Sequence, residues 1–515
     1  MHTQQLYSHL KGEGYTQQFN SALKSFLEDE GYVGQLNQAF YSWLGSKGYV
    51  GTLNERYTQW ALEGFPSGSP LASYFEANGF QPELAADFDG SSGEESYMVE
   101  GETSTFDAMF PGYARSSTAT YFDATGTLQT AAAGVPRLNS HIWDGSAWVN
   151  AGVLIESESR TNLVPYSSDF TNSEWTKIGV TLSSGVASPF GNTATRVTPD
   201  EATNGHKLYD LSVSSFASGE KVTWSVVAKA DGYDFCELRL ISQGTDTGGV
   251  QANSFAFFDL SSGAVGSVGT GISTFGSAQM TSLGDGWFRC SITAEVSTSG
   301  SLSAEVYPID QDYGNAYQTW LADGVSSVIF AAAQLEAGAT PSSYIPTNGS
   351  TVTRAADVLP IPAANLPWNP AGVSIAMRGR MTYADPGSPN FNFYRWAAEY
   401  NQYVSAEIDT DGSRTGQVVF AQREPVSGFD EVGSPTAHYS PGVGVPFSLA
   451  GRHTQSLLDG AVDGVGITEN TSPTALPDVS AVACNVANAG FMGHVSSFVM
   501  WPEDIGNTGI AEASA

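Results

Sequence analysis

The sequence predicts a mainly β protein, with two antiparallel β-sandwich (jelly-roll) domains preceded by a small α-helical repeat module. From about Ser117 onward, short runs of Val, Ile, Phe, Tyr and Thr alternate with turn residues, which is the pattern of half-buried strands. Helical periodicity is nearly confined to the first 64 residues. Asp-Gly pairs, which favour hairpin turns, begin at Asp144, Asp231, Asp285, Asp323, Asp411, Asp459 and Asp463.

The strand candidates are short and regularly spaced, which favours antiparallel sandwiches over a parallel α/β sheet. Trp224, Trp287, Cys236 and Cys290 lie inside apolar runs, so we expect them in the cores. Three cysteines are too few for a disulfide framework. Good candidates for strands include Val222–Ala228, Phe235–Ile241, Trp287–Val296, Val325–Gln334, Val373–Arg378 and Val495–Trp501.

A 17-residue repeat fills residues 1–64. Gly14-Tyr15, Gly31-Tyr32 and Gly48-Tyr49 recur in step, and apolar residues between them fall at i, i+4, i+7 and i+8, the stripe of an amphipathic helix. Glycine after such a stripe can end a helix. We expect three short helices, each marginal alone. They form a solenoid cap or bundle, a docking or trimerising module, or both.

Residues 65–116 are acidic. No Lys or Arg stands between Arg56 and Arg115, while Asp, Glu, Gly, Ser and Pro accumulate. This composition predicts an extended linker that wraps a neighbouring protein. Two further domains then follow, at 117–358 and 359–515.

The net charge of −32, from 21 basic and 53 acidic residues, excludes several partners. Such a surface repels the phosphates of nucleic acid and of anionic membranes. No run of about 18 apolar residues predicts membrane insertion. The N-terminus lacks the basic and apolar segments of a signal peptide. We therefore expect synthesis in a cytoplasm, no nucleic acid partner and no membrane insertion.

The middle of the chain, over about residues 117–358, contains a set of distinctive motifs. They are Thr120-Tyr121-Phe122-Asp123, Gly134-Val135-Pro136-Arg137, Gly152-Val153-Leu154-Ile155-Glu156, Arg160-Thr161-Asn162-Leu163, Ala333-Gln334-Leu335-Glu336-Ala337-Gly338, Ser343-Tyr344-Ile345-Pro346-Thr347 and Val352-Thr353-Arg354-Ala355-Ala356-Asp357. With these motifs the segment resembles the head-spike and tail-fibre proteins of tailed bacteriophages. The resemblance implies a sandwich similar to carbohydrate-binding modules. It also implies a place on the virion surface, after synthesis in the host cytoplasm.

The C-terminal part contains the segments Ser456-Leu457-Leu458-Asp459-Gly460 and Gly490-Phe491-Met492-Gly493-His494-Val495. With these segments it resembles laminin-G or concanavalin-like lectin sandwiches. His494 falls in an alternating strand, and we expect a structural or surface role for it. The resemblance implies a lectin-like domain at 359–515.

One loop has the chemistry of sugar binding. Aromatic faces stack on sugar rings, while amides and carboxylates hydrogen bond to hydroxyls. Residues 310–320 combine both between two strand candidates, in Asp312, Tyr313, Tyr317 and Trp320. We predict a carbohydrate site there. The alternative is that Tyr317 or Trp320 packs a sandwich edge.

No catalytic motif stands out, and the seven histidines show no metal-ligand spacing. We therefore expect a protein that is not an enzyme. Asp409 and Asp411 offer oxygen ligands of the kind that Ca²⁺ prefers, although a hairpin turn explains the same residues. No other cofactor is expected.

Together these observations predict a virion structural protein, a head-spike or tail-fibre subunit. Residues 1–116 would contact other virion proteins, and the sandwiches would contact glycans of the host surface during adsorption. Family resemblance implies a homotrimer. The alternatives are a polysaccharide depolymerase and a head-decoration protein without a ligand. A secreted adhesin fits less well, because a signal peptide is missing from the sequence.

Overall fold

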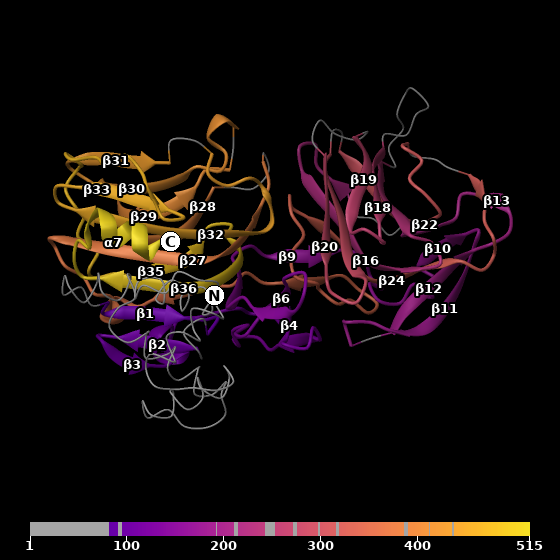
Figure 1. The fold of residues 1–515 in the computed structure, drawn as a ribbon, viewed down its shortest axis with the longest axis horizontal. Helices are drawn as coiled ribbons and strands as arrows, with labels where there is room; N and C mark the ends of the chain where they lie inside the picture. The colour runs from indigo at the N-terminus through magenta and orange to yellow at the C-terminus, as the bar shows by residue number, and fades with distance from the viewer. Residues whose placement is uncertain are drawn as a thin grey trace, which may run out of the picture.

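The structure is a computed structural model in which two β-sandwiches lie side by side with small hairpins between them (Figure 1). The mainly-β prediction is confirmed. The helical module predicted at 1–64 lies outside the described residues. The described residues are 82–90, 95–191, 193–210, 215–242, 253–270, 276–296, 299–315, 319–385, 390–410, 412–434 and 437–515.

The first sandwich packs a seven-stranded sheet against a six-stranded sheet, with antiparallel strand pairing. The first of these sheets runs β10 (Trp175–Ile178), β14 (Lys207–Asp210), β22 (Gly300–Ile309), β17 (Phe235–Ser242), β18 (Asn253–Asp259), β19 (Ala264–Thr270), with β15 (Ser215–Phe216) beside β22. The second runs β11 (Val180–Ala187), β12 (Thr193–Pro199), β24 (Ser327–Ala337), β16 (Lys221–Asp231), β21 (Trp287–Glu295), β20 (Gly276–Ser282). A short pair, β13 (Thr203–Asn204) and β23 (Trp320–Leu321), lies at one end.

The core of this sandwich contains the residues predicted for it. Trp224 on β16 and Cys236 on β17 are fully buried, and Cys290 lies 4.0 Å from Cys236 between their sulfur atoms. The Trp224 indole N–H donates to the Glu305 carbonyl. Trp287 is also buried, but in a smaller cluster on the other face of the six-stranded sheet.

The second sandwich packs a nine-stranded sheet against another six-stranded sheet. The larger sheet runs β3 (Glu102–Ser104), β2 (Ser96–Val99), β1 (Leu84–Asp87), β36 (Met492–Trp501), β27 (Gly372–Tyr383), β32 (Gly442–Thr454), β33 (Leu458–Val462), β34 (Val465–Gly466), with β8 (Val153–Glu156) paired to β36. The smaller runs β26 (Leu359–Ile361), β35 (Cys484–Asn488), β28 (Phe391–Glu399), β29 (Gln402–Ile408), β30 (Val418–Glu424), β31 (Gly428–Gly433). Helix α7 (Gly506–Ala513) covers the outer face of the larger sheet through Ile510. Two 3₁₀ turns, Ala363–Asn365 and Gly412–Arg414, complete this part.

The acidic segment differs from the prediction in the part that the structure describes. Residues 84–104 are not an extended linker, because β1 pairs with both β2 and β36. Phe88, Phe106 and Phe110 bury their rings against one another in the second core. Helix α6 (Phe106–Met109) carries Phe106, and Phe110 is its C-cap residue. Apolar burial of these rings fixes a segment that its charge alone would leave solvated.

Short elements join the two sandwiches (Figure 1). They are the hairpins β4 (Ala119–Phe122) with β5 (Leu128–Ala131) and β6 (His141–Trp143) with β7 (Trp148–Asn150), and the pair β9 (Arg160–Asn162) with β25 (Val352–Arg354). Strand β8 lies between them in sequence and reaches into the second sandwich through β36. One strand of the middle domain predicted at 117–358, β8, thus belongs to a sheet of the C-terminal domain.

The Asp-Gly pairs behave differently from one another. Those at Asp144, Asp285 and Asp463 stand in hairpin turns, as predicted. Asp459 instead lies inside β33, where it forms an ion pair with Arg452 at 2.8 Å. A Cβ at Gly460 would meet the Phe420 ring at 2.2 Å, so this glycine serves close packing and not a turn.

Among the residues that the structure describes, helices long and apolar enough to cross a bilayer are absent.

Candidate functional site

A cleft of about 300 Å³ opens where the two sandwiches meet the hairpins. Its walls come from β4–β7, from β16, β20, β21 and β24 of the first sandwich, and from β8, β27, β32 and β36 of the second. Ligand pockets of proteins begin at about this volume and occur preferentially at domain interfaces.

The β6–β7 hairpin presents two tryptophans to the cleft. Trp143 and Trp148 are directly paired across the hairpin, with ring centroids 6.1 Å apart. The turn between them is fixed by Asp144, whose Oδ1 accepts hydrogen bonds from the backbone N–H groups of Ser146 and Ala147, both at 2.8 Å. The sequence Trp-Asp-Gly-Ser-Ala-Trp therefore places two large aromatic rings on one small hairpin.

Neighbouring residues hold these rings in place. Trp148 packs on Phe122 with centroids 4.9 Å apart. A Cβ at Gly126 would come within 2.1 Å of the Trp148 indole nitrogen, so only glycine allows this approach. Trp143 lies against Gly284, in the turn between β20 and β21. Both rings remain partly exposed, which leaves aromatic surface for a ligand.

Two arginines reach the cleft from opposite sandwiches. Arg289 on β21 donates from Nη1 to the Ser342 carbonyl at 2.5 Å and from Nη2 to Ser225 Oγ at 3.0 Å. Arg380 on β27 donates to the Gly444 carbonyl at 3.2 Å. Each guanidinium is thus oriented by neutral oxygens, with further N–H groups left for a ligand.

His494 stands in the same wall, on β36. Its Nε2 lies 3.0 Å from Ser140 Oγ. Burial, followed by the nearby charge of Arg137, lowers the pKa of His494 to about 3. The imidazole is therefore neutral at physiological pH and acts as a hydrogen-bonding group. The structural role expected for His494 is compatible with this position.

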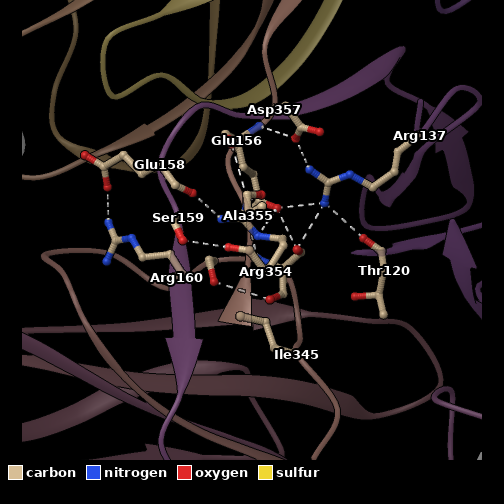
Figure 2. A network of polar contacts seen from close by, with 12 residues as sticks. Thr120, Arg137, Glu156, Glu158, Ser159, Arg160, Ile345, Arg354, Ala355 and Asp357 are labelled. Atoms are coloured by element: carbon tan, nitrogen blue, oxygen red, sulfur yellow. Dashed lines mark hydrogen bonds and ion pairs between the residues drawn. The ribbon is translucent and has the colours of Figure 1, made fainter. Parts of the chain in front are cut away.

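A buried ion network borders the cleft, which it reaches through Glu156, and Figure 2 shows its polar contacts. Arg137 contacts Glu156 at 2.7 Å and Asp357 at 2.5 Å. Arg354 lies 3.1 Å from Glu156, and Arg115 lies 3.0 Å from Asp357. All five side chains are almost completely inaccessible. The network therefore combines three cations with two carboxylates.

The network fixes the protonation of Glu156. Burial alone would raise the pKa of this carboxyl group, but Arg354, Arg137 and the hydrogen bonds from Ser343 lower it far below the usual range. Its Oε1 accepts from the Ser343 N–H at 2.7 Å and its Oε2 from the Ser343 hydroxyl at 2.6 Å. Glu156 is therefore a fully engaged carboxylate and not a proton donor.

The network is built from the motifs that resemble phage spikes and fibres. Arg137, Glu156, Ser343, Arg354 and Asp357 all belong to those motifs. They come from segments that lie up to 220 positions apart, and meet between the sandwiches (Figure 2). These five motif residues thus hold together the junction of the two sandwiches, where the cleft is formed.

Of the residues predicted for sugar binding, the three that the structure describes are not among those that line the cleft. Trp320 is buried, 8% exposed, with His206 and Tyr233 edge-on to its ring at 5.1 Å. This is the packing alternative at a sandwich edge, so the ring is not free to stack on a sugar. Asp312 accepts from the Ser267 N–H at 2.6 Å and Tyr313 donates to Asp310 at 2.9 Å. Both contacts shape the loop. Tyr317 lies outside the described residues.

The predicted calcium ligands are only partly described. Asp409 lies 3.4 Å from Arg414 Nε, and its backbone N–H and C=O bond to Gln417 and Gly416. Asp411 falls outside the described residues. Within the described part of the chain, no group of three or more His, Cys, Asp or Glu side chains is placed to hold a metal ion. Calcium binding here stays a prediction.

Sequence reasoning did not find the cleft. The Trp-Asp-Gly-Ser-Ala-Trp segment was the available signal, since a tight turn between two tryptophans places both on one small hairpin. Arg289 and Arg380 gave no signal, because they stand in strands of different sandwiches and line one cleft only where the sandwiches come together.

Comparisons with known proteins add distant likenesses. No protein family matches the sequence, and no curated protein matches it. A solved structure with some likeness is the CBM40 of a Ruminococcus gnavus IT-sialidase bound to α2,3-sialyllactose, at 10% identity and a TM-score of 0.24, covering 28% of this chain and 84% of that one. Another is domain 4 of AbnA, a GH43 extracellular arabinanase from Geobacillus stearothermophilus, in complex with arabinotriose, at 9% identity and a TM-score of 0.24, covering 35% and 81%. Domains LG4-5 of the mouse laminin α1 chain follow at 11% identity and a TM-score of 0.19, covering 55% and 83%. At such TM-scores these likenesses assign neither ligand nor activity.

Proposed function

We propose that the chain is a non-catalytic, glycan-binding surface subunit of a tailed bacteriophage, and that the cleft binds the glycan. The observation that carries the binding proposal is the tryptophan pair Trp143 and Trp148 at the edge of a mainly apolar cleft that contains a few polar side chains. Flat aromatic rings stack on sugar faces, and a few placed polar groups fix the orientation of the sugar. A volume of about 300 Å³ suits a short stretch of glycan.

The phage assignment is supported by the motifs of residues 117–358. Four of their charged members, Arg137, Glu156, Arg354 and Asp357, contact one another in the buried network, so these segments form one structural unit. Anchoring through residues 1–116 and a homotrimeric state belong to the same proposal. Several copies on a particle would multiply weak single-site binding, because linked sites act at high effective concentration.

The composition of the cleft favours binding over hydrolysis. Most glycosidases use two carboxyl groups, one of which donates a proton. Glu156 is the one acidic residue among those lining the cleft, and two arginines and Ser343 engage it. Incubation with host polysaccharide should therefore release no new reducing ends. Release of reducing ends would favour the depolymerase alternative.

Replacing Trp143 with alanine should weaken glycan binding by roughly 5- to 30-fold, which corresponds to about 1–2 kcal/mol for one lost aromatic stacking contact. A glycan array with the full chain identifies the ligand, and calorimetric titration then compares wild type with the variant. Tyr400→Ala is the matched control, because Tyr400 is 82% exposed and does not line the cleft.

Two results would contradict the binding proposal. One is an array without signal for the wild-type chain. The other is equal affinity of the Trp143→Ala and Tyr400→Ala variants for a ligand that the array identifies. Labelling of intact particles with an antibody against the chain tests the virion assignment separately. Light scattering tests the trimer, and a monomeric mass would contradict it.

A further inference from the structure

Among the described residues, Arg289 and Arg380 form no ion pair with a carboxylate, although the chain carries 53 acidic and only 21 basic residues. Eight other arginines of the described residues form ion pairs with carboxylates. In so acidic a protein, two cations directed at neutral oxygens within one cleft need a separate explanation.

We infer that the cleft selects glycans that carry an anionic group, a carboxylate above all, which Arg289 and Arg380 bind from opposite walls. This inference rests on the proposed function and names its ligand class. A guanidinium offers a planar set of N–H donors that matches a carboxylate. Both arginines keep N–H groups that are not used by the contacts described above.

The carboxylates that act electrostatically on Arg289 already have other hydrogen-bond partners. Glu336 and Glu156 are its acidic neighbours, and Tyr344 also faces it. Glu336 accepts from Gln334, and from both the N–H and the hydroxyl of Ser342. Glu156 is engaged by the buried network. Both carboxylates are therefore occupied, and neither forms an ion pair with Arg289.

Arg380 extends the positive charge across the cleft. It lies near His494, and its charge contributes to lowering the pKa of that imidazole. Its single described hydrogen bond goes to the Gly444 carbonyl. The network behind the wall adds three cations to two carboxylates. The wall of the cleft is thus locally positive on a molecule whose net charge is −32. A low-dielectric cleft concentrates such a field.

The remaining described arginines show that the cleft is distinctive. Arg395 and Arg423 lie over the rings of Tyr403 and Tyr400, and Arg378 donates to the Ala513 carbonyl in α7. None of these three lines the cleft. Among the described residues, Arg289 and Arg380 are therefore the arginines that form no ion pair with a carboxylate and that line the same cleft.

The test compares two oligosaccharides of equal length, one of galacturonic acid and one of galactose, together with a sulfated galactose oligomer. Calorimetric titration of the full chain should give an affinity for the galacturonic acid oligomer about tenfold or more above that for neutral galactose. The sulfated oligomer shows whether any anion suffices or a carboxylate is required.

Variants locate the effect. Arg380→Gln should remove most of the preference for the acidic oligomer, an expected loss of about tenfold or more for a charge-assisted contact. Its effect on the galactose oligomer should be small. Arg289→Lys keeps the charge but loses the forked donors, so it should weaken acidic binding while the fold persists. Arg196→Gln is the matched control. It removes the same charge as Arg380→Gln, but at a position in the first sandwich where Arg196 pairs with Asp231 outside the cleft.

The outcomes separate the two proposals. Equal binding of acidic and neutral oligomers, sensitive to Trp143→Ala, would overturn the anionic preference and leave the glycan site intact. Binding of acidic oligomers that Arg380→Gln leaves unchanged would also overturn it. Absence of binding to every oligosaccharide, on the array and in titration, would overturn the proposed function together with this inference.

Discussion

Replacing Arg137 with alanine should destabilise the protein by about 3–5 kcal/mol. The guanidinium is fully buried and joins Glu156 to Asp357. Its removal leaves both carboxylates in a low-dielectric site with fewer cations, and an uncompensated buried charge is costly. Urea unfolding followed by circular dichroism measures the change, with tryptophan fluorescence as a second probe because two sandwiches need not unfold together.

Arg196→Ala is the control for that experiment. Arg196 forms an ion pair with Asp231, but its side chain is 41% exposed. Exposed pairs contribute about 0–1 kcal/mol, so this variant should unfold close to wild type. If Arg137→Ala were no less stable than Arg196→Ala, the network would have no role in holding the junction.

Acidification should destabilise the second sandwich through His453. This imidazole is fully buried, and its Nε2 lies 3.0 Å from the Tyr394 hydroxyl. Burial lowers the pKa of His453 from 6.5 to about 3. The unfolded chain therefore binds a proton that the folded chain excludes. This stability contribution is complete above pH 6.5 and is lost as the pH falls toward 3. The expected loss is about 3 kcal/mol at pH 4, from about 1.4 kcal/mol per pH unit.

The variant His453→Gln isolates this contribution. Glutamine cannot titrate, so the decline in unfolding free energy between pH 6.5 and pH 4 should become shallower by about 3 kcal/mol. Tyr394→Phe is the control, because it removes the hydrogen bond to His453 but keeps the imidazole, and the decline should remain. Urea titrations at half-unit pH steps provide the measurement. An unchanged decline in His453→Gln would show that His453 is not the responsible group.

Strand positions were largely readable from the sequence, because burial and alternation are local. The candidates at Val222–Ala228, Phe235–Ile241 and Val373–Arg378 fall inside β16, β17 and β27. The burial of Trp224 and Cys290 followed from the same apolar runs. These features depend on neighbours in the chain, which a single sequence contains.

The pairing of strands that lie far apart in the chain could not be predicted from the sequence. The acidic composition of residues 84–104 predicts a linker when only this segment is considered. The strand that pairs with it, β36, lies some 400 positions further along the chain. The candidate site shows the same limit. Asp312, Tyr313 and Trp320 were chosen by composition, but the structure uses them for loop and edge packing. Arg289 and Arg380 line the same cleft only because the two sandwiches come together there.

The pairing of β36 with β1, β8 and β27 has a consequence for biosynthesis. The first sandwich is complete once the ribosome has passed β24, so it can fold while the rest is still being made. The second sandwich lacks its central strand until translation reaches Trp501. Until then, the backbone N–H and C=O groups of β1 and β8 that pair with β36 have no strand partner. The cleft is therefore among the last parts of the protein to mature, and nascent chains that stall before β36 would carry a folded first sandwich without a ligand site.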